Sequence, residues 1–127
     1  MTMVQTLFLF KGRINRAKYW LIQLLMLVTI LSLFILGLST GRSDNDPVIG
    51  NESDVGRIVI VVLFGIIFGW INLAIQIKRW HDRDRSGWWV FIELIPFIGT
   101  IWAFVELGCL KGTAGENRFG PDSLERS

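Results

Sequence analysis

The sequence predicts an all-α, polytopic membrane protein: a small transmembrane helix bundle with two clear spans and a third segment that forms either a Pro-broken span or a re-entrant helical pair. Three observations lead to this fold class. Of the 127 residues, 51% are hydrophobic and only 19% are charged. The mean hydropathy is +0.46, and the apolar residues gather in three blocks. Because the bilayer core offers no water to an open backbone, such blocks cross a membrane as helices.

The first two apolar blocks, residues 19–38 and 58–77, contain no charged side chain. Each matches the roughly 20 residues that a helix needs to cross a hydrocarbon core of roughly 30 Å. A cleavable signal peptide is the competing interpretation of residues 1–40. However, the apolar run exceeds the roughly 7–15 residues of a signal core, and no small-residue cleavage site is evident. We therefore expect a first span that stays in the membrane.

The third block, residues 88–110, is interrupted by Glu93, Pro96, Gly99 and Glu106. As one helix it is long enough to span, with a kink where Pro96 lacks an amide. As two short halves it would enter the membrane and return, which requires protein or water to satisfy the opened backbone. The sequence leaves both paths open.

Lysine and arginine beside the apolar blocks predict the orientation, since cytoplasmic flanks carry an excess of these residues. Four lie in residues 1–18, four in residues 78–87 and only two in residues 39–57. We expect a single membrane domain, residues 1–127, with a cytoplasmic or interfacial N-terminus, an external loop over 39–57 and a cytoplasmic linker over 78–87. The side of the polar tail, residues 111–127, depends on the path of the third block.

Reactive residues are scarce, and their scarcity excludes several kinds of site. The single Cys109 rules out an internal disulfide, and one histidine cannot complete a Cys/His zinc site within this chain. His81 beside Asp82 resembles one pair of a metal phosphohydrolase, but no second histidine exists. The pI is near 9.0, yet the basic residues flank the apolar blocks instead of forming one stripe. We expect no metal, no cofactor, no catalytic residue and no nucleic-acid partner.

Two sets of residues stand out within the helices. Gly65 and Gly69 form a G-x-x-x-G pair, which permits close approach of another helix. The second set is polar, and its members need partners because a charge at the bilayer centre costs roughly 2.5–3.5 kcal/mol. This candidate intramembrane polar set is Asn72, Gln76, Glu93 and Glu106.

Helical spacing places two members of this set on one stripe with two arginines, and this stripe must face protein or water: Asn72, Gln76, Arg79 and Arg83. We expect Arg79 to pair with Glu93, since both lie near the same interface. A structural clamp between helices is the simpler interpretation, and a proton-accessible pocket is the alternative.

Three stretches of the sequence together resemble a known family. They read F-x-G-R-x-x-R-x-x-Y-W from Phe10, R-x-H-D-x-x-x-S-G-W-W from Arg79 and G-T-x-G-x-N-R-F-G-P-D from Gly112. In order and spacing they resemble the domain of unknown function 805 family of small bacterial inner-membrane proteins. This resemblance implies an inner-membrane location and brings no established reaction, substrate or cofactor. Two positions depart from the family pattern: Trp80 stands where Leu is common, and Ser123 where Pro is frequent.

The resemblance carries over, position by position, to a set of motif residues, most of which lie at the membrane boundary: Gly12, Arg13, Arg16, Tyr19, Trp20, Arg79, His81, Asp82, Ser86, Gly87, Trp88, Pro96, Gly99, Gly112, Gly115, Asn117, Arg118, Phe119 and Gly120. We hypothesise that the N-terminal motif, the linker and the tail fold into one polar cap. Hydrogen bonds among Arg13, Arg16, Asp82 and Arg118 would hold it. The candidate cap residues are Arg13, Arg16, Arg79, His81, Asp82, Ser86, Asn117 and Arg118, with Ser86 as an N-cap of the following helix.

These features lead to three hypotheses of function. The first is a non-catalytic accessory or scaffolding component of the inner membrane, alone, as a homo-oligomer or with another membrane protein, in contact with the lipid bilayer. The second is a small transporter or channel subunit whose polar route is lined by Asn72, Gln76, Glu93 and Glu106. The third is an enzyme of lipid or envelope precursors, with His81 as base and Asp82 orienting it.

Overall fold

The computed structural model describes residues 2–39 and 52–124. Within these ranges the fold is helical and contains no strand, as the sequence predicts. Most of the predicted external loop, residues 39–57, lies outside the described residues, as does the end of the tail.

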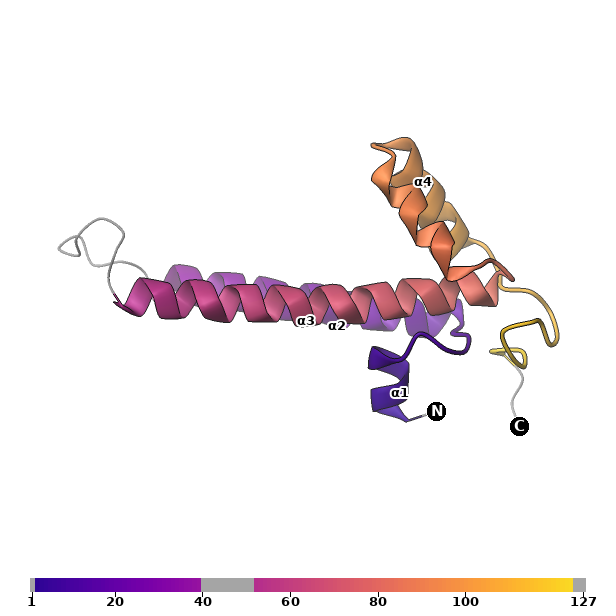
Figure 1. Cartoon of the computed structure of the whole chain (residues 1–127), viewed down its shortest axis with the longest axis horizontal. Coiled ribbons are helices and arrows are strands. Elements are labelled where there is room, and N and C mark those ends of the chain that lie inside the picture. The colour runs from indigo at the N-terminus through magenta and orange to yellow at the C-terminus, as the bar shows by residue number, and fades with distance from the viewer. Residues whose placement is uncertain (1, 40–51, 125–127) are drawn as a thin grey trace.

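Two long helices dominate the molecule and lie side by side, α2 (Arg16–Ser39) and α3 (Glu52–Asp82) (Figure 1). The Asn15 carboxamide begins α2 by accepting a hydrogen bond of 2.9 Å from the Lys18 amide. Both helices are long and apolar enough to cross a membrane, and only 6% of the α2 window and 11% of the α3 window are buried inside the protein. The prediction of two helices of spanning length is confirmed.

Helix α3 continues beyond the predicted span and through the first half of the linker. It ends in a Schellman motif. In this motif the Arg85 amide donates a hydrogen bond to the Trp80 carbonyl at 2.9 Å, and the Asp84 amide donates to the His81 carbonyl at 3.0 Å. Asp84 takes the left-handed conformation that this motif requires, with φ of 55°. The charged end of α3 is therefore helical, and its side chains have fixed directions.

The third apolar block forms two short helical arms and not one continuous helix, so it has the form of the helical pair that was one of the two alternatives. A 3₁₀ helix, η1 (Gly87–Leu94), leads into a turn, and α4 (Ile98–Ala103) continues into one wide π-type segment, η2 (Phe104–Cys109). Gly99 makes this turn possible, because a Cβ there would lie 1.7 Å from the Ile92 carbonyl oxygen. We call these three elements the hairpin; it leaves the C-terminal end of α3 at a steep angle (Figure 1).

A short N-terminal helix, α1 (Met3–Phe8), lies on the other side of the α2–α3 pair from the hairpin (Figure 1). Thr2 and Gln5 form a capping box at its start. At its end, the buried Lys78 ammonium of α3 donates to the Thr6 carbonyl at 2.6 Å, and the Trp70 indole donates to the Phe8 carbonyl at 3.1 Å. Carbonyls at the end of α1 that have no partner within the helix thus bind side chains of α3 and fix α1 to it.

The hydrophobic core is small and lies where the end of α3 meets the hairpin. Its buried members are Trp80, Ala103 and Leu107, with Tyr19 of α2 and Trp89 packed against them. This cluster joins α2, α3 and the hairpin at the same end of the molecule as the charged residues, and so it positions the site described next.

Candidate functional site: the polar cap

Asp82, the last residue of α3, is the centre of a hydrogen-bonded cluster at one end of the molecule. Its carboxylate accepts bonds from Arg13 Nε at 3.1 Å, from Ser123 Oγ at 2.6 Å and from Arg79. Its backbone carbonyl accepts from the amide and the hydroxyl of Thr113, at 2.7 and 2.8 Å. One residue therefore joins the N-terminal motif, α3 and the tail.

Arg13 binds the tail as well as Asp82. Its guanidinium donates to three backbone carbonyls, those of Thr113 at 2.6 Å, Gly115 at 2.8 Å and Gly120 at 3.2 Å. The side chain is 2% exposed, and it forms an ion pair of 3.0 Å with Asp82. Five donors in a planar fork suit this combination of carboxylate and carbonyls, which a lysine would not satisfy.

Arg79 connects the cap to the hairpin. Its Nε donates to the Leu107 carbonyl at 2.7 Å, and its terminal nitrogens donate to the Leu110 carbonyl and to Asp82. The expected pairing of Arg79 with Glu93 is therefore wrong. Asp82 lies one turn along the same helix and is within reach, whereas the turn of the hairpin places Glu93 beside Gln76.

His81 is held by the tail. Its ring stacks on Phe119, with centroids 3.9 Å apart and planes within 5°, and its Nδ1 lies 3.2 Å from the Gly12 carbonyl oxygen. The Asn117 side-chain carboxamide donates a hydrogen bond to the His81 carbonyl at 2.8 Å. Within the described part of the chain, the imidazole makes no hydrogen bond to Asp82.

The remaining candidate cap residues lie at the periphery, and among the described residues they bond partners other than Asp82. Arg16 donates to the Cys109 carbonyl at 2.8 Å. Arg118 pairs with Asp84, its Nε 3.3 Å from a carboxylate oxygen. Ser86 accepts the Trp88 amide at 3.5 Å at the start of η1, so it occupies the N-cap position with a long bond.

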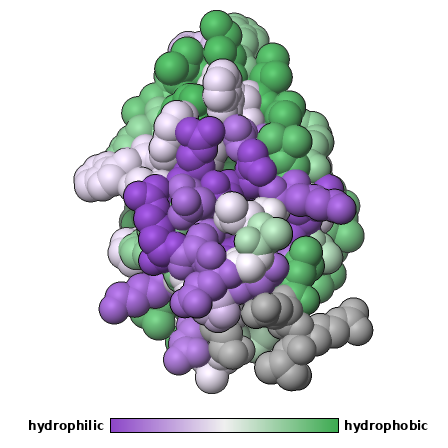
Figure 2. Space-filling view, turned by 90° about the vertical axis from the view of Figure 1, so that its right-hand side faces the viewer, coloured by the Kyte–Doolittle hydropathy of each residue, from purple (hydrophilic) through white to green (hydrophobic). Residues whose placement is uncertain are grey.

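The tail folds over the end of α3 as a tight loop. Gly115 and Gly120 have φ of 75° and 138°, conformations that other residues rarely adopt. Asp122 accepts the amides of Leu124 and Gly115, each at 2.9 Å, and these donors hold the pKa of its carboxyl below its ordinary value of 3.8. Figure 2 looks onto this end and shows the hydrophilic residues gathered there, with hydrophobic residues above and beside them.

Three residues that complete the cap were not in the candidate cap set: Gly112, Thr113 and Ser123. Gly112 lies so close to Asp82 that a Cβ would be 2.0 Å from its carboxylate oxygen. Thr113 and Ser123 supply the hydroxyl donors described above. Gly112 stands in a motif, which is a signal that could have found it, but nothing local distinguishes Ser123 from a surface serine.

Comparison with known proteins identifies the family of this chain. The chain matches the family described as "Protein of unknown function (DUF805)" over residues 7–121. This chain belongs to the DUF805 family. The match begins in α1 and ends in the tail loop, so it includes Arg13, Arg79 and Thr113, which all bond Asp82, but not Ser123.

Curated relatives cover most of the chain. Inner membrane protein YhaH of Escherichia coli (strain K12) is 41% identical over 113 residues, 89% of this chain and 85% of the relative. Inner membrane protein YhaI of the same strain is 31% identical over 118 residues, 89% and 84% of the two chains. Uncharacterized protein YiiR is 29% identical over 149 residues, 98% and 92% of the two chains. No solved structure matches. With its two spanning-length helices, this DUF805 protein is an inner-membrane protein, as the sequence predicted.

The candidate intramembrane polar set does not form one group in this DUF805 protein. Asn72 accepts from Gln23 of α2 at 3.1 Å and from Gln76 at 3.2 Å, and Gln76 reaches Glu93 at 3.5 Å. Glu106 lies apart from these residues and pairs with Arg83 at 2.9 Å. The fold places the two glutamates on opposite arms of the hairpin, so the four residues do not form one polar cluster within the described part of a single chain.

Gly65 and Gly69 lie on the surface of α3. A Cβ built on either glycine would meet nothing within 4 Å. Within the described chain the pair therefore does not serve intramolecular helix packing, although its face is open to another helix. Residues 2–39 and 52–124 also contain no group of three His, Cys, Asp or Glu side chains placed to hold a metal ion.

Proposed function

We propose that the protein is a non-catalytic scaffold of the inner membrane. Its two membrane-spanning helices hold a rigid polar cap and the hairpin at the cytoplasmic face. The observation that carries this proposal is the use of the motif side chains. Arg13 and Arg79 both donate hydrogen bonds to the Asp82 carboxylate, and each also donates to backbone carbonyls. Groups bonded in this way fix three chain segments together and leave little polar capacity for a substrate.

The same geometry supports a topology with two crossings and both ends of the chain in the cytoplasm. The excess of Lys and Arg in residues 1–18 and 78–87 favours a cytoplasmic cap. Arg13 and the tail carbonyls are in direct contact, so the two segments share one side of the membrane. The hairpin then enters the cytoplasmic leaflet and returns, with Leu94 and Phe97 at its tip, 76% and 84% exposed.

Cysteine accessibility tests this topology. In a Cys109→Ser background, an impermeant maleimide added to spheroplasts should label Ser43→Cys, in the predicted external loop. It should label Ala114→Cys, in the tail, only after the membrane is permeabilised. Labelling of Ala114→Cys from outside would overturn the shared side and with it the scaffold.

The enzyme hypothesis receives less support from the cap. A catalytic dyad needs His81 and Asp82 within hydrogen-bond reach of each other. His81 instead faces Gly12 and Phe119, while Asp82 faces two arginines and Ser123. Both residues thus serve the docking of the tail.

A transport role is the second candidate, and one observation favours it. Gln76 Oε1 is buried without a partner in the described structure, beside Glu93, which lies in the apolar block. Reconstituted vesicles separate the two candidates: the scaffold predicts no flux of protons, Na⁺ or K⁺ under an imposed gradient. Flux that is lost in Glu93→Gln, with folding unchanged, would replace the scaffold by a transporter.

A further inference from the structure

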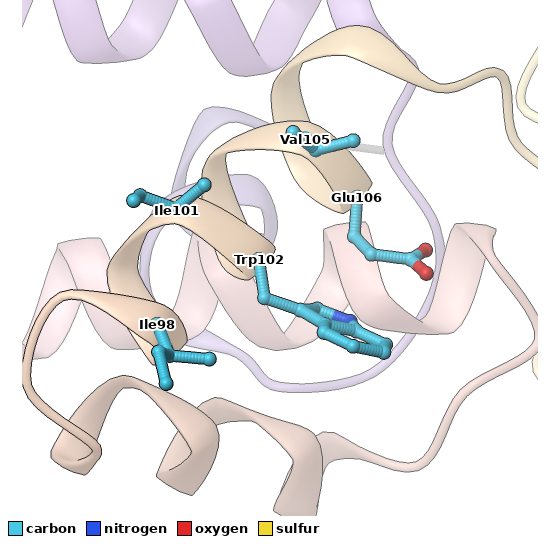
Figure 3. Close-up of a pocket in the computed structure, with 5 residues that line it drawn as sticks. All are labelled: Ile98, Ile101, Trp102, Val105 and Glu106. Carbon is cyan, nitrogen blue, oxygen red and sulfur yellow. The ribbon is translucent and has the colours of Figure 1, made fainter.

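A groove runs along the outer face of the helix formed by α4 and η2 (Figure 3). Its volume is about 460 Å³, within the range of roughly 300–1,000 Å³ that is usual for small-ligand sites. Four apolar residues and one acid line it, at the spacing of a single helix face: Ile98, Ile101, Trp102, Val105 and Glu106.

The walls of the groove are apolar and open to the surroundings of the protein. Ile98 is 67% and Ile101 64% exposed, and the Trp102 ring is nearly half exposed. Because the hairpin belongs to an inner-membrane protein, hydrocarbon can cover this surface at no cost, whereas water cannot.

One end of the groove is polar and carries more positive than negative charge. Glu106 closes it, with the Arg83 Nε at 2.9 Å and the Arg85 terminal nitrogen at 4.0 Å. The Arg85 guanidinium lies 4.5 Å above the Trp89 ring, and its side chain is 38% exposed. Two cations against one carboxylate leave a net positive charge at the mouth of an apolar groove.

We propose that this groove binds one anionic phospholipid of the cytoplasmic leaflet, with an acyl chain along Ile98, Ile101 and Val105 and the phosphate at Arg83 and Arg85. A phospholipid joins a long apolar chain to an anion, which matches the apolar wall and the cationic end. Basic pockets beside membrane helices on the cytoplasmic side bind anionic headgroups. The site rests on the proposed topology, in which the hairpin enters the cytoplasmic leaflet, and not on the scaffold role.

Native mass spectrometry of the protein in mild detergent, titrated with palmitoyl-oleoyl phosphatidylglycerol or phosphatidylcholine, tests the site. We expect the protein to bind phosphatidylglycerol with an affinity at least about fivefold higher than its affinity for phosphatidylcholine. Arg85→Gln should lower the affinity for phosphatidylglycerol about fivefold and leave that for phosphatidylcholine unchanged. Equal retention of the two lipids by the parent protein would overturn the proposal.

A pair of matched substitutions tests the groove itself. Val105→Trp fills the groove and should weaken binding of both lipids about tenfold or more. Val61→Trp adds the same ring to the exposed face of α3, far from the hairpin, and should leave binding unchanged. Ile101→Phe is a smaller change in the same groove, to be read together with thermal unfolding in case Val105→Trp fails to fold. Undiminished binding in a folded groove variant would contradict the site.

Discussion

The two ends of the α2–α3 pair bury opposite kinds of side chain. At the cap, Lys78 and Arg79 are fully buried, and Arg13 and Asp82 are at most 7% exposed. In the outer half of α3, residues 55–67 are all exposed, although nearly all are apolar. In a bilayer the apolar surface needs no protein cover, so tertiary specificity comes from polar groups that lipid cannot satisfy. We therefore expect substitutions of polar residues in the cap to destabilise the protein more than substitutions of apolar residues in the outer half of α3.

The largest effect should follow Asp82→Asn, which leaves two buried arginines without their carboxylate. Removing one partner of a buried ion pair costs about 3–5 kcal/mol. The variant should lose that much unfolding free energy in detergent, measured by denaturant titration. A loss below about 1 kcal/mol, the usual value of an exposed pair, would break the contrast between the two ends.

Asp84→Asn is the matched control for this variant. Asp84 is two residues away and also pairs with an arginine, but both side chains of the Asp84–Arg118 pair are about half exposed. Asparagine tolerates the positive φ of this position. The expected change is at most about 1 kcal/mol.

Two glycine substitutions compare the cap and the outer half directly. Gly112→Ala drives a Cβ into the Asp82 carboxylate, at 2.0 Å, and should cost about 2–3 kcal/mol. Gly56→Ala, in the outer half of α3, meets nothing within 4 Å and should stabilise the helix by about 0.5–1 kcal/mol. Thermal unfolding measures both, and equal effects would show that the cap is not closely packed.

The two hairpin glutamates should differ in the same manner. Glu106→Gln removes the partner of Arg83 and should cost about 1–2 kcal/mol. Glu93→Gln removes a charge that has no cationic partner in the described structure, and the change should stay within about 0.5 kcal/mol. A larger loss for Glu93→Gln, measured in the same titration, would indicate a buried cation partner in the membrane.

The smallest effect concerns the docking of the tail at acid pH. The folded pKa of Asp122 is depressed, so its contribution is present above pH 3.8 and is lost as pH falls through the folded pKa. A spin label at Ala114→Cys, in a Cys109→Ser background, should become more mobile over that range. Asp122→Asn should show the mobile spectrum already at higher pH, whereas Glu116→Gln should follow the parent profile.

Sequence reasoning predicted what depends on local pattern. The spans follow from two uncharged blocks of the right length. Pro96 and Gly99 mark an interruption of the third block, but the sequence did not decide between one kinked helix and a helical pair. It did not predict the partner of Arg79, because helical spacing shows which side chains share a face but not how the hairpin folds back. Sequence reasoning also did not predict the hydrogen bonds from Arg13 to the tail carbonyls. Every residue has a backbone carbonyl, so the residue type does not show which carbonyls accept a bond.

A double-mutant cycle on Arg13 and Asp82 tests most directly whether these charges join distant segments of the chain. The variants are Arg13→Gln, Asp82→Asn and the double variant, and the readout is unfolding free energy in one detergent. If the pair holds the N-terminal motif against the end of α3, the two changes should couple by about 2–3 kcal/mol. Strictly additive losses would mean that the two residues act independently, which would contradict the cap as the element that unites this fold.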